Sequence, residues 1–195
     1  MILGVTGNIA SGKSRVAAML RDRGCALVDA DKVAHGLYAS NPALVREIAS
    51  EFGEDIILHG GILDRKRLGS RVFGDAAALA ALDRIVHPHL AAAIREQAFA
   101  ATRMMNRVVV DAALIYEWGM EREFGAIILV TAPEALRLAR TMERDGLSQE
   151  EAEARIRSQM PESEKIPKAT YVIENTGTES ELEAKVEKVW ERITK

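Results

Sequence analysis

The chain has 195 residues, of which 48% are hydrophobic and 28% are charged. This length and composition predict one compact globular unit and do not favour disorder. The formal net charge is -3 at pH 7, which gives no general positive field for binding nucleic acid, so we expect no nucleic-acid partner. The single cysteine, Cys25, excludes an intramolecular disulfide.

The amino-acid sequence shows no signal for secretion or for insertion into a membrane. It contains neither the basic leader and apolar stretch of a signal peptide nor a window that approaches a membrane span. We therefore expect a cytoplasmic protein without a membrane partner. No obligate protein partner is evident.

Five short apolar runs are candidates for buried parallel strands, and long helical patterns separate them. Strands that alternate with helices predict the α/β class, with a five-stranded parallel sheet covered on both faces. The predicted strands lie at residues 2–5, 25–28, 107–110, 126–130 and 171–173.

The first strand is followed by the strongest motif, Gly7-Asn8-Ile9-Ala10-Ser11-Gly12-Lys13-Ser14, and then by a helical pattern. It fits the G-x-x-x-x-G-K-[ST] phosphate-binding loop, called the P-loop below, at every fixed position and predicts a P-loop NTPase-like fold. Glycines let successive backbone N–H groups point at phosphate oxygens, and the helix N-terminus favours anions. Lys13 is predicted to stabilise the moving phosphoryl group of ATP, and Ser14 to ligate Mg²⁺. Arg15 adds charge beside the loop or faces solvent.

The second strand ends in Val28-Asp29-Ala30-Asp31, where extended geometry would place both carboxylates on one face. Ligands of parallel α/β sheets bind at the carboxyl ends of strands. We predict that Asp31 orients the acceptor hydroxyl and receives its proton. Capping of a helix that starts at Lys32 is the alternative for Asp31, and a structural acceptor is the alternative for Asp29.

About eighty residues separate the second and third strands, far more than a crossover needs. We expect a helical acceptor-binding insertion at about 32–105, with Asp75 capping an alanine-rich helix. His87-Pro88-His89 lacks a third metal ligand, so a substrate contact from His87 is favoured over a metal site, and Pro88 is expected to mark a helix boundary.

The third strand ends in Asp111, where folds of this kind place a carboxylate near the metal, and we expect contact through water. A loop-capping role is the alternative. A basic segment at about 133–168 is predicted to be a lid, although a solvated helix pair would have the same charge pattern. Ser148 with Glu151 and Ser180 with Glu183 indicate capping boxes. The core is expected at 1–31, 106–132 and 169–195 of this single unit.

Taken together, the motifs resemble the dephospho-CoA kinase family over nearly the whole chain. The resemblance is carried by Thr6-Gly7 through Lys13-Ser14, Val28-Asp29-Ala30-Asp31, His87-Pro88, Leu114-Ile115-Tyr116-Glu117, the Arg140 to Ala152 segment, Gln159, Lys165 and Val172-Ile173-Glu174-Asn175-Thr176-Gly177. Asn8 and Ala10 depart from it, because glycines are frequent there, and so does Arg15, where threonine is common.

The resemblance implies that the substrates are ATP, with Mg²⁺, and dephospho-CoA, whose ribose 3′-hydroxyl would face Asp31. Arg140 and Arg144 would contact phosphates, and Arg140 would be catalytic together with Lys13 and Asp31. Asn175 and Gly177 would lie near adenine. Thr6, His87, Leu114 and Glu117 would help to bind the acceptor. From the residues alone a nucleoside or nucleotide kinase remains open, whereas a nucleotide switch is disfavoured because no Asn-Lys-x-Asp segment is present.

Overall fold

A computed structural model describes residues 1–72 and 74–195. The chain forms two compact units, one of residues 1–29 with 96–195 and the other of residues 30–95. Across these described residues, no helix combines the length and the apolar character that a bilayer crossing needs.

The larger unit is built on a five-stranded sheet, and all four strand pairs are parallel. The α/β class and the five-stranded parallel sheet are therefore confirmed. β1 lies at the centre of the sheet, so the loop that follows it opens between two neighbouring strand ends. The strands, in spatial order, are β2 (Ala26–Asp29), β5 (Val108–Asp111), β1 (Ile2–Thr6), β6 (Ala126–Thr131) and β7 (Tyr171–Glu174).

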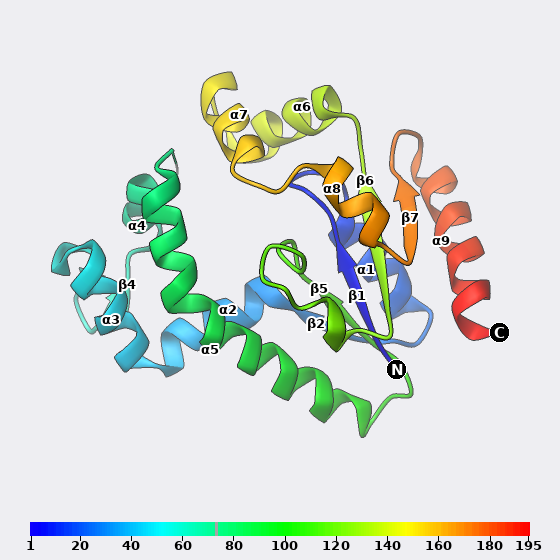
Figure 1. Ribbon diagram of the computed structural model, residues 1–195, viewed down its shortest axis with the longest axis horizontal. Helices are drawn as coiled ribbons and strands as arrows, with labels where there is room; N and C mark the ends of the chain where they lie inside the picture. The colour runs from blue at the N-terminus through cyan, green and yellow to red at the C-terminus, as the bar shows by residue number, and fades with distance from the viewer. Residues whose placement is uncertain (73) are drawn as a thin grey trace. The chain divides into compact units, whose positions relative to one another are not determined.

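One face of the sheet is covered by two helices, α1 (Lys13–Asp22) and α9 (Glu179–Thr194), which contact each other (Figure 1). Leu3 and Val5 of β1 are fully buried in the same cluster as Leu20 of α1 and Val186 of α9. Because side chains alternate along a strand, this face takes the odd positions of β1. The helix predicted after the P-loop is therefore fixed to the sheet by an apolar stripe.

The other face of β1 is approached by the segment that follows β5. A Cβ atom at Gly4 would lie 2.9 Å from Ile115 and 3.1 Å from Phe124, so a larger residue would require these side chains to shift. The segment includes η2 (Glu121–Glu123) and returns the chain to β6. It thereby places residues 112–117 beside the carboxyl end of the central strand.

The residues between β6 and β7 form α6 (Glu134–Asp145), α7 (Gln149–Arg157), α8 (Glu162–Lys165) and η3 (Ile166–Lys168). α6 and α7 lie beyond the carboxyl end of β6 (Figure 1). The capping box of Ser148 and Glu151 is confirmed. The predicted box of Ser180 and Glu183 is wrong, because α9 begins two residues earlier and Thr178 and Glu181 form its box.

The smaller unit contains α2 (Ala30–Ser40), α3 (Pro42–Phe52), η1 (Glu54–Ile56), β3 (Ile57–Leu58), β4 (Ile62–Leu63), α4 (Arg65–Val72) and the first part of α5 (Ala76–Thr102). The antiparallel β3–β4 hairpin was not expected in a segment predicted to be almost wholly helical. Its strands have two residues each, too short for a periodic signal.

Two helix boundaries in this unit test the sequence signals. Asp75 caps α5 as predicted, since its Oδ1 accepts hydrogen bonds from the N–H groups of Ala77 and Ala78. Pro88, predicted to mark a boundary, instead lies inside α5. Proline costs about 3 kcal/mol inside a helix, and apolar burial on both sides, at Val86 and Leu90, offsets this cost.

Candidate active site

The P-loop, residues 7–14, joins β1 to α1 and depends on two glycines. A Cβ atom at Gly7 would lie 2.3 Å from the carbonyl oxygen of Val130, and one at Gly12 would lie 2.2 Å from Nδ2 of Asn175. Gly12 also has φ 96°, a conformation that disfavours any other residue. The tight loop that the motif predicts is therefore enforced by contacts with β6 and with the turn after β7.

Ala10 is the one residue other than glycine that has a positive φ among the described residues, with φ 59°. The left-handed conformation costs an L-amino acid roughly 1–2 kcal/mol. Ala10 stands where the resemblance leads one to expect glycine. The outer half of the P-loop is thus strained, and contacts elsewhere must hold it.

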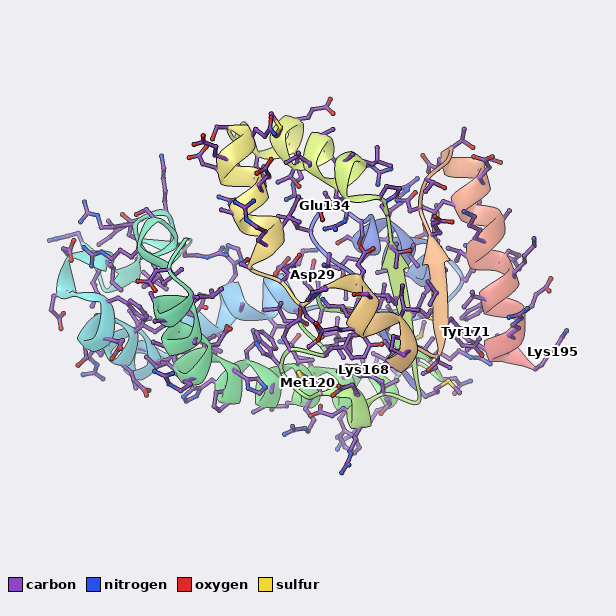
Figure 2. All side chains as sticks on the ribbon, turned by 45° about the horizontal axis from the view of Figure 1, so that its top comes forward. Asp29, Met120, Glu134, Lys168, Tyr171 and Lys195 are labelled. Carbon is purple, nitrogen blue, oxygen red and sulfur yellow. The ribbon has the colours of Figure 1, made fainter. Side chains whose placement is uncertain are left out.

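The P-loop lysine contacts the acidic end of β5. Nζ of Lys13 lies 2.7 Å from Oδ1 of Asp111, and 3.5 Å from Oγ of Ser14. Asp111 is 5% exposed and is the register partner of both Val5 on β1 and Asp29 on β2. Lys13, Ser14 and Asp111 therefore form one cluster at the carboxyl edge of the sheet, where Figure 2 also marks Asp29.

This cluster fits Mg²⁺ only together with phosphate ligands. No group of three or more histidine, cysteine, aspartate or glutamate side chains able to hold a metal occurs in the described part of the chain. A hydroxyl from Ser14 and a carboxylate from Asp111 are the sparse protein set that Mg²⁺ takes when phosphates and waters complete its shell. The proximity of Ser14 and Asp111 is consistent with Mg²⁺ that binds as a complex with the nucleotide.

The turn after β7 is tied to the inner side of the P-loop. Nδ2 of Asn175 donates a 2.8 Å hydrogen bond to the carbonyl oxygen of Ser11, and Asn175 is 8% exposed. Gly177, two residues on, would place a Cβ atom 1.9 Å from the Glu181 carboxylate of the α9 capping box. A side chain at Gly177 would displace the Glu181 carboxylate that accepts hydrogen bonds from Thr178, so the predicted adenine-side segment has a structural role as well.

The outer side of the P-loop meets the predicted lid at three points. Nη1 of Arg140 donates to the carbonyl oxygen of Ala10 at 3.3 Å. The backbone N–H of Ile9 donates to Oε1 of Gln159 at 2.7 Å, and Nδ2 of Asn8 donates to the carbonyl oxygen of Met160 at 3.1 Å. Arg140 is thereby brought to the loop, and the chain segment that leaves α7 is docked on it.

Glu117 contacts the segment that follows α7, residues 159–165, called the returning segment below. Its Oε1 accepts a 3.2 Å hydrogen bond from the N–H of Met160 and lies 2.6 Å from Nζ of Lys165. The Lys165 side chain is 0% exposed. A lysine buried so completely requires a carboxylate partner, so Glu117 has a structural task besides the predicted contact with the acceptor.

A second, largely buried ion pair lies in the predicted lid. Nε of Arg137 is 3.0 Å from the carbonyl oxygen of Ala132 and 3.4 Å from Oε1 of Glu162. Burial raises the pKa of the Glu162 carboxyl, and the neighbouring Arg137 guanidinium partly offsets this shift. Both residues line a cavity of about 640 Å³ beside Asn8.

The basic residues of the predicted lid are largely buried or paired with acidic side chains. Arg137 and Lys165 are buried, whereas Arg155 pairs with Asp145 and Arg157 with Glu153. The acidic residues interleaved in this segment take up much of its positive charge. Sequence alone could not separate these internal pairs from a solvated charge run, because Arg137, Lys165 and Arg155 each have a partner ten or more residues away.

Four predicted site residues make other contacts. Thr6 donates from Oγ1 to the carbonyl oxygen of Ala113 at 3.1 Å and is fully buried. Arg15 is 57% exposed and pairs with Glu179 at the start of α9, and Arg144 is 58% exposed and pairs with Asp145. Leu114 is half-buried. None of these contacts joins them directly to the Lys13 cluster.

Asp31 and His87 belong to the smaller unit. The extended geometry predicted for Asp29 and Asp31 ends at Asp29, and α2 begins at Ala30, so the expectation of two carboxylates on one strand face is wrong. Asp31 is exposed in the first turn of α2, where the helix dipole stabilises a carboxylate. His87 is half-buried within α5.

Comparison with known proteins extends these observations over the whole chain. The sequence pattern of the dephospho-CoA kinase family matches residues 1–181. A dephospho-CoA kinase of Anaeromyxobacter dehalogenans is 40% identical over 189 residues, which cover 96% of this chain and 90% of that protein. A solved protein of Thermus thermophilus has a TM-score of 0.77 at 37% identity and covers 100% of this chain and 96% of its own. The solved dephospho-CoA kinase of Campylobacter jejuni has a TM-score of 0.63 at 31% identity, covering 98% and 96%.

Proposed function

Because the chain belongs to the dephospho-CoA kinase family, we propose that this protein transfers the γ-phosphoryl group of ATP to the ribose 3′-hydroxyl of dephospho-CoA, giving ADP and coenzyme A. The observation that carries the proposal is the P-loop with Lys13 placed 2.7 Å from the buried Asp111. This arrangement supports phosphoryl transfer, and family membership supports the choice of acceptor.

The backbone of the P-loop and the N-terminus of α1 supply the anion site. Successive N–H groups of the loop would bind the phosphate oxygens, and the positive end of the α1 dipole favours the same charge. Lys13 would leave Asp111 for the β- and γ-phosphates and stabilise the charge of the moving group. Positioning and charge stabilisation suffice for direct transfer, so no covalent phospho-enzyme is needed.

Ser14 and Asp111 would hold Mg²⁺, directly and through water respectively. The ion, when bound with ATP, neutralises charge on the β- and γ-phosphates. Arg140 and Arg144 project from α6, which follows the carboxyl end of β6. We propose that both approach the phosphates, Arg140 by exchanging its present contact with the Ala10 carbonyl oxygen for a phosphate oxygen.

Asp31 is proposed as the base that orients the acceptor hydroxyl and takes its proton. Its support is its place two residues after β2, whose carboxyl end lies at the edge of the sheet that carries the P-loop. It is exposed and in the first turn of a helix, so it can meet a substrate. His87, Leu114 and Glu117 are proposed to contribute to the acceptor site.

Acceptor-dependent release of ADP tests the proposal. Purified protein with MgATP is expected to form ADP when dephospho-CoA is added, and the product should have the mass of coenzyme A. Asp31→Asn should lower kcat by about 100-fold or more, with ADP affinity unchanged, because the amide cannot accept the proton. Asp22→Asn, on the surface of α1, is the control. An Asp31→Asn protein with normal turnover would remove the base assignment, and a wild-type protein without turnover would refute the reaction.

A further inference from the structure

The outer half of the P-loop is held by a side chain and a backbone carbonyl group from a distant part of the chain. Ile9 gives its backbone N–H to Gln159, and the Asn8 side chain gives an N–H to the carbonyl oxygen of Met160. These contacts join residues about 150 positions apart in sequence. They reach the two loop residues that immediately precede Ala10.

The docked segment is itself anchored behind the loop. The N–H of Met160 is bound by Glu117, and Glu117 is paired at 2.6 Å with the fully buried Lys165. Leaving this lysine buried without its partner would be strongly unfavourable. Met160 thus has its carbonyl oxygen on the P-loop and its N–H on an anchored carboxylate, so the segment is fixed from both sides.

The loop needs such support because its own sequence does not favour its conformation. Ala10 has φ 59°, where glycine would be at ease and alanine is strained. An N–H group at Ile9 that lost its acceptor would also be free to turn away from this geometry. A loop held in its binding shape before the nucleotide arrives loses less conformational entropy on binding.

We propose that Gln159 and Glu117 are positioning residues, which hold the segment returning from α7 against the P-loop and thereby preform the nucleotide site. Gln159 acts on the loop directly, and Glu117 acts through Met160. The inference rests on nucleotide binding by the P-loop, as in the proposed function, but does not depend on which acceptor is used.

The direct test is ADP affinity, measured by calorimetry on the full-length protein without any acceptor. Gln159→Met keeps the length of the side chain but removes the acceptor for the Ile9 N–H. We expect the dissociation constant for ADP to rise roughly 2- to 12-fold, the range of one hydrogen bond. Gln149→Met is the matched control, because Gln149 is exposed on α7 and bonds only Glu153 in the contacts described for it. An unchanged ADP affinity in Gln159→Met would overturn the proposal.

Steady-state kinetics separate positioning from general damage. In Gln159→Met the KM for ATP should rise with the dissociation constant of ADP, while kcat and the KM for the acceptor stay within about twofold of wild type. A fall in kcat with both KM values altered would indicate a disturbed fold and contradict a positioning role. If wild type binds ADP but does not turn over dephospho-CoA, the proposed function fails while the ADP comparison still decides this inference.

A double-mutant cycle tests the part played by Glu117. Glu117→Gln should weaken ADP binding through the segment, so its effect should be smaller once Gln159→Met has removed one of the two contacts of the segment with the loop, while the contact between Met160 and Asn8 remains. Full additivity of the two effects would exclude coupling through the segment. If Glu117→Gln does not fold, because Lys165 is left without a carboxylate, the Gln159→Met comparison alone decides whether the loop is positioned.

Discussion

The P-loop, residues 7–14, and the returning segment, residues 159–165, form two sides of the same site but are specified in different ways. The P-loop is defined by its own consecutive residues: glycines at 7 and 12, a lysine and a serine. The returning segment acts through single side chains, Gln159 and Lys165, whose partners are Ile9 and Glu117. Its sequence resembles an ordinary charged surface stretch.

This contrast shows that the residues that bind phosphate can be adjacent in sequence, whereas the residues that position them come from distant parts of the chain. A backbone anion site needs only a turn, glycines and a helix N-terminus, all of which are adjacent in sequence. The strain at Ala10, however, must be balanced by contacts, and these come from Arg140 of α6 and from residues 159 and 160 beyond α7. The comparison therefore predicts that changes in the loop affect catalysis, whereas changes in the returning segment affect stability or affinity.

The largest effect is expected for Lys13→Ala, which breaks the chemical side of the comparison. Loss of the positive charge should lower kcat by about 100-fold or more, because charge stabilisation in the transition state is lost. The change also leaves Asp111 buried without its ion-pair partner, so circular dichroism must confirm folding. Lys188→Ala on the exposed side of α9 is the control. Activity within about tenfold of wild type would contradict the role of Lys13.

Arg137→Met tests whether the lid is fixed by its buried pair. The free energy of unfolding should fall by about 3 kcal/mol, because Glu162 keeps a buried carboxylate without its partner. Arg157→Met removes an exposed pair with Glu153 and should cost less than about 1 kcal/mol. Denaturant unfolding of both variants measures the difference. Equal losses in the two would mean that burial of the Arg137 pair is not what matters.

Ala10→Gly sharpens the argument about strain in the P-loop. Glycine adopts φ 59° without steric cost, so the free energy of unfolding should rise by about 0.5–1 kcal/mol after the entropy of the added glycine is counted. The free energy of unfolding is measured with urea. Ala184→Gly in α9 is the control, and it should lower this free energy because glycine disfavours a helix. Destabilisation by Ala10→Gly would show that the loop is not strained at this position.

The smallest effect concerns Tyr116, next to the anchoring Glu117. Its hydroxyl is buried and makes no hydrogen bond within residues 1–72 and 74–195, and burial raises its pKa to about 12. The unfolded chain releases this proton near pH 10, so wild type should lose stability as the pH rises from about 10 to 12. Tyr116→Phe should lack this loss.

Urea midpoints at about pH 9 and about pH 11 measure the difference between wild type and Tyr116→Phe. Tyr171→Phe, on β7, controls for the general effect of alkaline pH. A wild-type protein and a Tyr116→Phe variant whose midpoints change in parallel would contradict the raised pKa.

The strands and the P-loop could be predicted because each has a local signal, an apolar run or a fixed spacing of glycines and a lysine, and the parallel direction followed from the alternation of strands with helices. The β3–β4 hairpin and the continuation of α5 through Pro88 could not, since two-residue strands have no period and a proline signal was outweighed by burial. The roles of Gln159 and Lys165 depend on partners far apart in the chain, and no local pattern identifies such pairs. The extended backbone predicted through Asp29 and Asp31 was wrong at Asp31, because α2 begins at Ala30.

The central claim is tested most directly by competition between acceptors. The protein is incubated with MgATP and equal concentrations of dephospho-CoA, adenosine, AMP and CMP, and the phosphorylated products are identified by mass. The account predicts that coenzyme A is the main product, with ADP formed in equal amount. Phosphorylation of adenosine, AMP or CMP in preference to dephospho-CoA would contradict it.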